Sequence, residues 1–226
     1  MKNHYTENVD KHHLSRGADR IDSSGYRSRM KLGVIAFFCL LSIVGNLATS
    51  FLASALHAPI FLDTIFTVAI TFYAGLVPGL IVAVLHNPIR TFIRSVIYGT
   101  DLFYFGSLYA VCGMLIALST WIFSRNKKDF FFNRTVTVLY LLIIVFVSSF
   151  LSCFSASALD TFIRPLLNDS LRFFPTDIFS IPFQKLKFGM FLSYLLPRIP
   201  ITVLDRLICT FSGFGLYRLV ERRTAC

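Results

Sequence analysis

The chain lacks the short motifs with which common enzyme families bind phosphate, zinc or an acyl group. Its 226 residues contain no G-x-x-x-x-G-K-[ST] loop, no H-E-x-x-H and no G-x-S-x-G. The chain therefore cannot hydrolyse ATP by itself, and no nucleophile beside a base is readable. We expect a protein that is not an enzyme and that uses no cofactor.

Cysteine is scarce and is not arranged for metal binding. No C-x-x-C pair and no Cys/His spacing of a metal site occurs. Four of the five cysteines lie inside apolar runs, where we expect them to act as small packing residues. The five are Cys39, Cys112, Cys153, Cys209 and Cys226.

Acidic residues are few, with 12 Asp and Glu against 22 Lys and Arg, which gives a net charge of +10. A positive excess of this size is common among nucleic-acid-binding proteins. Here, however, no basic stripe with interleaved aromatics lies outside the apolar runs. Most Lys and Arg instead stand at the ends of those runs, as membrane topology requires. Nucleic acid is therefore not an expected partner.

Hydrophobic residues, by contrast, are abundant. They make up 55% of the chain, with 25 Phe and a mean hydropathy of +0.66, values typical of a membrane protein. Residues 1–31 are polar and are predicted to form a disordered cytoplasmic tail, followed by a membrane domain over residues 32–223. The run Leu32–Ala55 is long enough to cross the bilayer and is the predicted first span.

The segment from Ile60 to Leu85 allows two interpretations. It is either a single span kinked by glycine and proline, or a tight hairpin of two short spans that turns at Gly75–Gly79. Further on, Leu102–Phe123 and Val136–Leu159 are predicted spans, and a connector runs from Asp160 to Lys187. Two runs follow the connector: Phe188–Leu196, predicted to be interfacial or re-entrant, and the last span, Ile199–Val220.

The distribution of positive charge favours the hairpin. With six spans, both termini and the Arg125–Arg134 loop share one side of the membrane, and 14 of the 22 Lys and Arg lie on that side. Five spans would separate the basic tail from the basic loop and C-terminus. The positive-inside rule therefore predicts an all-α protein of six transmembrane helices, the second and third short, with both termini cytoplasmic.

The order and spacing of several apolar motifs resemble the substrate-binding S components of energy-coupling factor (ECF) transporters, from about Lys31 to Arg223. These motifs are Leu62–Ile65 with the following Gly75 and Pro78-Gly79, then Gly79–Asn87, Tyr109–Ala117 and Pro200–Ile208. The resemblance implies a six-helix protein of the bacterial cytoplasmic (inner) membrane. Such a protein binds a vitamin-like or other micronutrient at the outer face, and works with a coupling membrane subunit and a pair of ATPases.

The first span departs from the family pattern in one respect. S components often carry an Ala-x-x-x-Ala face that meets the coupling subunit, whereas here the inner half of the span offers Gly33, Ala36 and Ser42 without that repeat. These three residues are the candidate partner contacts.

An outward-facing S component binds its ligand near the outer membrane face, so polar residues at the outer ends of spans are the candidate ligand contacts. Arg90 and Arg94 share a helix face if the helix continues past Pro88, and would either clamp an anion or anchor the span at lipid headgroups. Asp205 is expected to pair with Arg94 or Arg90 rather than with its neighbour Arg206, in an ion pair or a ligand site. The full set is His57, Asn87, Arg90, Arg94, Asp101, Asp205 and Arg206.

Three further expectations concern single residues or small groups. Asp63 is expected to be a solvated carboxylate at the start of the second span. His57 and His86 are expected to be interfacial rather than metal ligands. The small residues Gly45, Thr49 and Ala53 recur every fourth position and are expected to pack inside the bundle.

A second function class fits the same sequence. The chain would then be a membrane sensory or scaffolding module whose tail meets a cytoplasmic partner.

Overall fold

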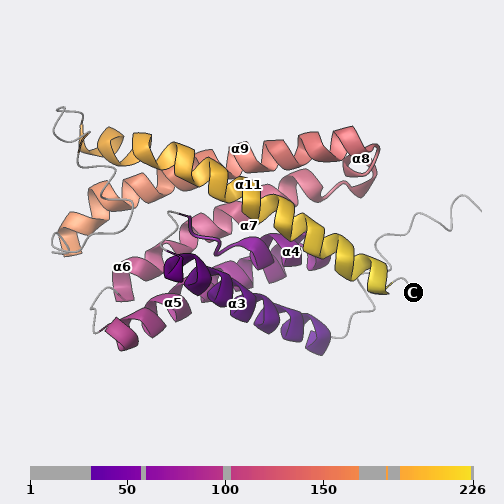
Figure 1. Ribbon diagram of the computed structural model, residues 1–226, viewed down its shortest axis with the longest axis horizontal. Helices are drawn as coiled ribbons and strands as arrows, with labels where there is room; N and C mark the ends of the chain where they lie inside the picture. Colours follow the sequence, from indigo (N-terminus) through magenta and orange to yellow (C-terminus); the bar gives the residue numbers. More distant parts are fainter. Residues whose placement is uncertain (1–31, 57–59, 99–102, 168–181, 183–188, 225–226) are drawn as a thin grey trace, which may run out of the picture. The chain divides into compact units, whose positions relative to one another are not determined.

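The computed structural model describes residues 32–56, 60–98, 103–167, 182 and 189–224. It divides the chain into two units, Met1–Ala36 and Phe37–Cys226. The predicted tail of residues 1–31 lies outside the described residues. All contacts given below are within the second unit. Figure 1 shows its helices, coloured from indigo towards the N-terminus to yellow towards the C-terminus.

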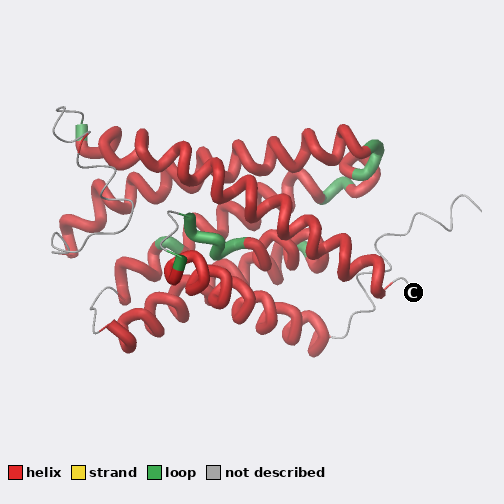
Figure 2. Tube along the Cα trace, in the orientation of Figure 1, coloured by secondary structure: helices red, strands yellow, loops and turns green. Residues whose placement is uncertain are grey.

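Most of the described residues are helical, and no strand occurs among them (Figure 2). The predicted spans Leu102–Phe123 and Val136–Leu159 are confirmed as helical, with bounds that differ by a few residues. The α-helices are α3 (Leu32–Ala55), α4 (Ile65–Ala74), α5 (Leu76–Tyr98), α6 (Phe103–Leu108), α7 (Ala110–Ser124), α8 (Lys127–Phe130), α9 (Arg134–Ala158) and α11 (Met190–Thr224). A π-helical turn, Leu159–Ile163, and a 3-10 turn, Arg164–Leu167, follow α9.

Five of the described helices are long and apolar enough to cross a bilayer. They cover Leu32–Ala55, Leu76–Ile97, Gly106–Ser124, Arg134–Ile163 and Met190–Arg223. Large apolar side chains lie on their outer surface, such as Phe146 and Phe150 on α9, which are 60% and 70% exposed. Exposure of so extensive an apolar surface is unfavourable in water, whereas contact of that surface with lipid is favourable. The chain is a multi-pass membrane protein.

A turn separates α4 from α5, as the hairpin interpretation predicted. Only α4 is short, however: α5 has 23 residues and Leu76–Ile97 is long enough to cross a bilayer, so the prediction of a short third helix was wrong. Gly75 ends α4 with φ 94°, a left-handed conformation that favours glycine. The two helices then run back along each other, and a Cβ at Gly79 would lie 2.1 Å from Thr71 Oγ1. This close approach requires glycine at position 79, and α4 and α5 are therefore separate helices.

The last helix differs from the prediction. Met190–Leu196 was expected to belong to a separate interfacial piece, but it forms the first turns of α11, which continues through Pro197 and Pro200 to Thr224. The piece was set apart because Phe188–Leu196 is too short to cross a bilayer alone. Packing of α11 against both α4 and α9 keeps the helix continuous instead (Figure 1).

The strip of small residues on α3 packs inside the bundle, as predicted. A Cβ at Gly45 would lie 2.6 Å from the Phe66 ring, and Ala53 is 1% exposed. The Thr49 hydroxyl donates to the Leu62 carbonyl at 2.5 Å. The strip therefore brings α3 against the segment that precedes α4.

An aromatic cluster fixes the far end of α4. Phe72 lies in the core beside Phe130 and Tyr217, with ring centroids 5.6 and 5.7 Å away. Lys127 of α8 donates from Nζ to the Phe72 carbonyl at 3.1 Å, at the C-terminal end of α4. Its ammonium lies 5.0 Å from the centre of the Tyr217 ring. α4 is thus held at its C-terminal end, and its N-terminal end faces a cluster of charges.

Candidate functional site

The site begins with an interruption of regular structure before α4. Residues 60–64 are not helical, and Leu62 adopts φ 47°, a left-handed conformation that is rare for a branched side chain. The backbone N–H groups of Phe61 and Leu62 both donate to Asp205 Oδ1, each at 2.9 Å. Asp205 is completely buried, so a carboxylate of α11 supplies the hydrogen bonds that a helix would otherwise provide.

Four charged groups meet at this interruption. Arg90 of α5 pairs with Asp63, with 3.1 Å between Nη1 and Oδ2. Arg206 of α11 lies between two carboxylates, with its Nη2 2.8 Å from Asp205 Oδ2 and 3.7 Å from Asp63 Oδ1. Its other terminal nitrogen donates to the hydroxyl of Thr64. We call Asp63, Arg90, Asp205 and Arg206 the charged network; its formal charges sum to zero.

An amide from α3 completes the N-terminal end of α4. Asn46 is fully buried, its Oδ1 accepts the Phe66 N–H at 2.9 Å, and its Nδ2 donates to Thr67 Oγ1 at 2.9 Å. Thr64, at the N-cap position of α4, makes no side-chain cap of its own because its hydroxyl accepts from Arg206. Side chains from α3 and α11 therefore hold the first turn of α4, which is not capped from its own sequence.

His86 lies beside the charged network. It is 2% exposed, and neither ring nitrogen has a hydrogen-bond partner among the described residues. Arg206 Nε is likewise without a partner there. Buried polar atoms normally bind protein, water or a ligand. These atoms therefore offer hydrogen-bonding positions to a small molecule or to water.

A second group of buried polar residues connects α7, α9 and α11. The Tyr109 hydroxyl donates to Asp160 Oδ1 at 2.6 Å, and Arg198 Nη2 lies 2.6 Å from Asp160 Oδ2. Asp160 is 1% exposed and belongs to the π-helical turn Leu159–Ile163. Such turns widen a helix locally and are frequent at functional sites.

One face of α11 joins the two groups. Arg198, Thr202 and Arg206 follow one another at intervals of four residues, so they lie on the same side of the helix. All three are buried. The thiol of Cys112 on α7 lies 3.7 Å from the Ser152 carbonyl of α9. A polar stripe therefore runs through the interior of an otherwise apolar bundle.

Several predicted ligand residues meet in this site and others do not. Arg90, Asp205 and Arg206 belong to the charged network, and Asn87 is buried next to His86. α5 does continue past Pro88, which puts Arg94 one turn beyond Arg90, where it contacts Ser54 Oγ at 3.4 Å. His57 and Asp101 lie outside the described residues.

The predicted partner of Asp205 was wrong. We expected Arg90 or Arg94, because side chains of adjacent helical residues diverge by about 100°. The guanidinium of Arg206 nevertheless reaches back to Asp205, since an arginine side chain is long enough to overcome that divergence. Arg90 is then available to Asp63.

The expected surroundings of Asp63 and His86 were also wrong. Asp63 is 9% exposed and paired rather than solvated, and His86 is buried rather than interfacial.

Of the candidate partner contacts, Gly33 and Ala36 are exposed whereas Ser42 is buried, so the three do not form one exposed face.

The residues that sequence reasoning missed are Asn46, Thr64, Tyr109, Asp160 and Arg198. Asp160 was assigned to the connector, because the predicted span ended at Leu159, and Arg198 lay between the two predicted runs Phe188–Leu196 and Ile199–Val220. Both residues carry a charge directly beside an apolar run, and this feature of the sequence could have identified them.

The described cysteines Cys39, Cys112, Cys153 and Cys209 are free thiols. No three His, Cys, Asp or Glu side chains converge on a metal position in the described part of the chain.

Comparison with known family models, characterised proteins and solved structures finds no match to this chain.

Proposed function

We propose that the chain is the substrate-capture subunit of a membrane importer and binds a small polar molecule at the charged network. The observation that carries this proposal is the interruption before α4, where two backbone N–H groups end on the buried Asp205. Interrupted helices of this kind, with charges inside the bundle, commonly form substrate sites in transporters. Charged side chains inside a membrane bundle are costly and are usually retained for function.

In this proposal, residues 60–74 form one more span in addition to the five long helices, which brings the total to six. The ten residues of α4 rise about 15 Å. The five non-helical residues before it add at most roughly 16 Å, because Leu62 is not extended, so the two pieces together approach a hydrocarbon layer of about 30 Å. Six spans place both termini on the cytoplasmic side, in agreement with the positive charge of the chain ends.

In this proposal, the ligand binds to a network whose charges already sum to zero, by forming hydrogen bonds in place of water. Its binding does not require a net charge, because Asp63 and Asp205 balance Arg90 and Arg206. The unpartnered nitrogens of His86 and Arg206 supply hydrogen bonds to it. A vitamin-like or other micronutrient with several polar atoms satisfies these conditions.

The capture proposal is tested on the purified full-length chain. Small molecules are extracted by denaturation and identified by mass spectrometry, with an Arg90→Gln/Asp63→Asn double variant as the control. The neutral pair keeps the approximate shape of the site and removes two charges. Capture predicts a compound enriched in the wild-type extract and depleted in that of the double variant. Identical extracts contradict it.

The energy for transport comes, in this proposal, from an ECF coupling subunit and an ATPase pair. The exposed Gly33 and Ala36 of α3 are the proposed contacts. A tagged chain should co-purify with the ATPases, and Ala36→Trp should abolish that association while leaving the extracted compound unchanged. Co-purification of a signalling protein in place of the ATPases would favour the sensory alternative.

A further inference from the structure

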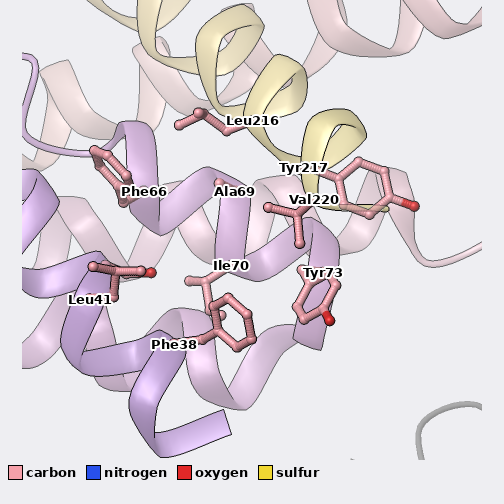
Figure 3. A pocket seen from close by; sticks show the side chains of 10 residues that line it. Phe38, Leu41, Phe66, Ala69, Ile70, Tyr73, Leu216, Tyr217 and Val220 are labelled. Carbon is pink, nitrogen blue, oxygen red and sulfur yellow. The ribbon is translucent and has the colours of Figure 1, made fainter. Parts of the chain in front are cut away.

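An apolar groove lies on the surface of the bundle between α3, α4 and α11. Figure 3 shows Phe38 and Leu41 of α3, Phe66 and Tyr73 of α4, and Leu216 and Val220 of α11 around it. Its volume is about 110 Å³. Leu41 on its rim is 49% exposed, so the groove opens to the outside of the helices.

The groove lies at the basic end of the bundle. α3 contributes residues near its start and α11 residues near its end, whereas α4 lines the groove along its whole length. The loop region 125–134 and the α11 residues 216–224 together contain seven Lys and Arg against two acids. One of those acids, Glu221, is paired with Arg218 at 2.9 Å and accepts the Tyr217 hydroxyl at 2.6 Å. Positive charge therefore remains in excess where the groove ends.

Helix periodicity places one arginine in line with the groove. Leu216 and Val220 line it, and Arg223 follows Val220 by three residues, so all three share a face of α11. Arg223 is exposed. Its neighbour Arg222 is also exposed but points about 100° away from that face. The apolar floor thus leads to a guanidinium at its end.

We propose that this groove binds one anionic phospholipid, with an acyl chain between α3, α4 and α11 and the headgroup phosphate at Arg223. The apolar lining matches a hydrocarbon chain, and the excess positive charge at one end matches the phosphate. An arginine can bind a phosphate through two parallel N–H groups. The lipid covers an apolar concavity that no side chain of the described residues fills. The proposal does not depend on the captured substrate.

The test uses native mass spectrometry of the delipidated full-length chain, to which phosphatidylglycerol or phosphatidylcholine with identical acyl chains is added. The wild type is expected to retain one phosphatidylglycerol about fivefold more strongly than phosphatidylcholine, the ratio that about one basic residue supplies at a membrane surface. Arg223→Gln should remove that preference, and Arg222→Gln should keep it. Equal retention of the two lipids, or equal effects of the two variants, overturns the proposal.

Filling the groove tests the position of the acyl chain. Ala69→Phe from α4 and Leu216→Trp from α11 each place a bulky ring in the groove, and either one should weaken retention of both lipids. Two variants on different helices are used because one of them can fail to fold, which a thermal melt detects. Unchanged retention in the variant that folds overturns the proposal. So does a wild-type dimer that Leu216→Trp dissociates without a change in lipid retention, since a second copy then occupies the groove.

Discussion

At the scale of single residues, the pairing of Arg90 with Asp63 is central to the account. The two charges lie 3.1 Å apart with side chains only 16% and 13% exposed, and the other cation near Asp63 is Arg206 at 3.7 Å. A buried carboxylate that loses its partner is costly, whereas a half-buried arginine such as Arg94 contributes less. Stability measurements on Arg90 and Arg94 separate a structural pair from a headgroup anchor.

Arg90→Ala should lower the free energy of unfolding by roughly 3 kcal/mol, because Asp63 keeps its charge and loses its nearer cation. Arg94→Ala, one turn away on the same helix, should change it by less than about 1 kcal/mol. Thermal or denaturant melts in one detergent measure both. The Asp63→Asn/Arg90→Gln double variant should recover much of the loss, because no uncompensated charge remains. If Arg90→Ala and Arg94→Ala melt alike, the pair does not stabilise the fold.

The sequence indicated the charges of this network but not their partners. Asp205 and Arg206 stand out because they interrupt an apolar run, and charge at that depth predicts a pair or a site. Which oxygen meets which nitrogen depends on the reach of long side chains across helices, which helical spacing alone does not specify. Asn46 carries no charge and gives no comparable signal, although it holds the first turn of α4.

At the scale of helices, the crossing of α11 with α4 sets the geometry of the interruption. Gly213 allows this contact: a Cβ at that position would lie 2.6 Å from the Ile65 carbonyl and 2.9 Å from Val68 Cβ. Ile65 is the first residue of α4. Close approach at Gly213 therefore brings α11 to the N-terminal end of α4, where Asp205 and Arg206 act.

Gly213→Ala should destabilise the protein by about 1–3 kcal/mol, because the added methyl group meets backbone that cannot move alone. Gly215→Ala provides a matched control on the same helix, since nothing lies within 4 Å of a Cβ there. It should be neutral or stabilise by up to about 1 kcal/mol through helix propensity. Melts of the two variants under the same conditions check this. Equal destabilisation by both would show that the crossing is looser than described.

Helix positions were largely predictable, and helix ends less so. Apolar runs predicted the long helices, and the Gly75–Gly79 pattern together with the charge distribution predicted the hairpin. The helical turns that follow α9 and the start of α11 were not predicted, because a π-helical turn and two prolines inside a helix depend on tertiary packing rather than local preference.

At the scale of the whole molecule, the six-span proposal makes opposite ends of α9 accessible from opposite sides of the membrane. Lys128 precedes α9 and is exposed, and Leu166 follows it and is 78% exposed. In intact cells, a membrane-impermeant thiol reagent should label Leu166→Cys and not Lys128→Cys, each in a background without native cysteines. The reverse labelling pattern contradicts cytoplasmic termini.

The central claim is that the charged network binds a small polar molecule, and native mass spectrometry of matched arginine variants tests it most directly. The full-length chain, purified gently from its producing membrane, is predicted to carry one small molecule in addition to any lipid. Arg90→Gln should lose it, and Arg94→Gln, one turn away and outside the network, should retain it. A wild-type spectrum showing only chain and lipid, or a molecule retained equally by both variants, would contradict the account.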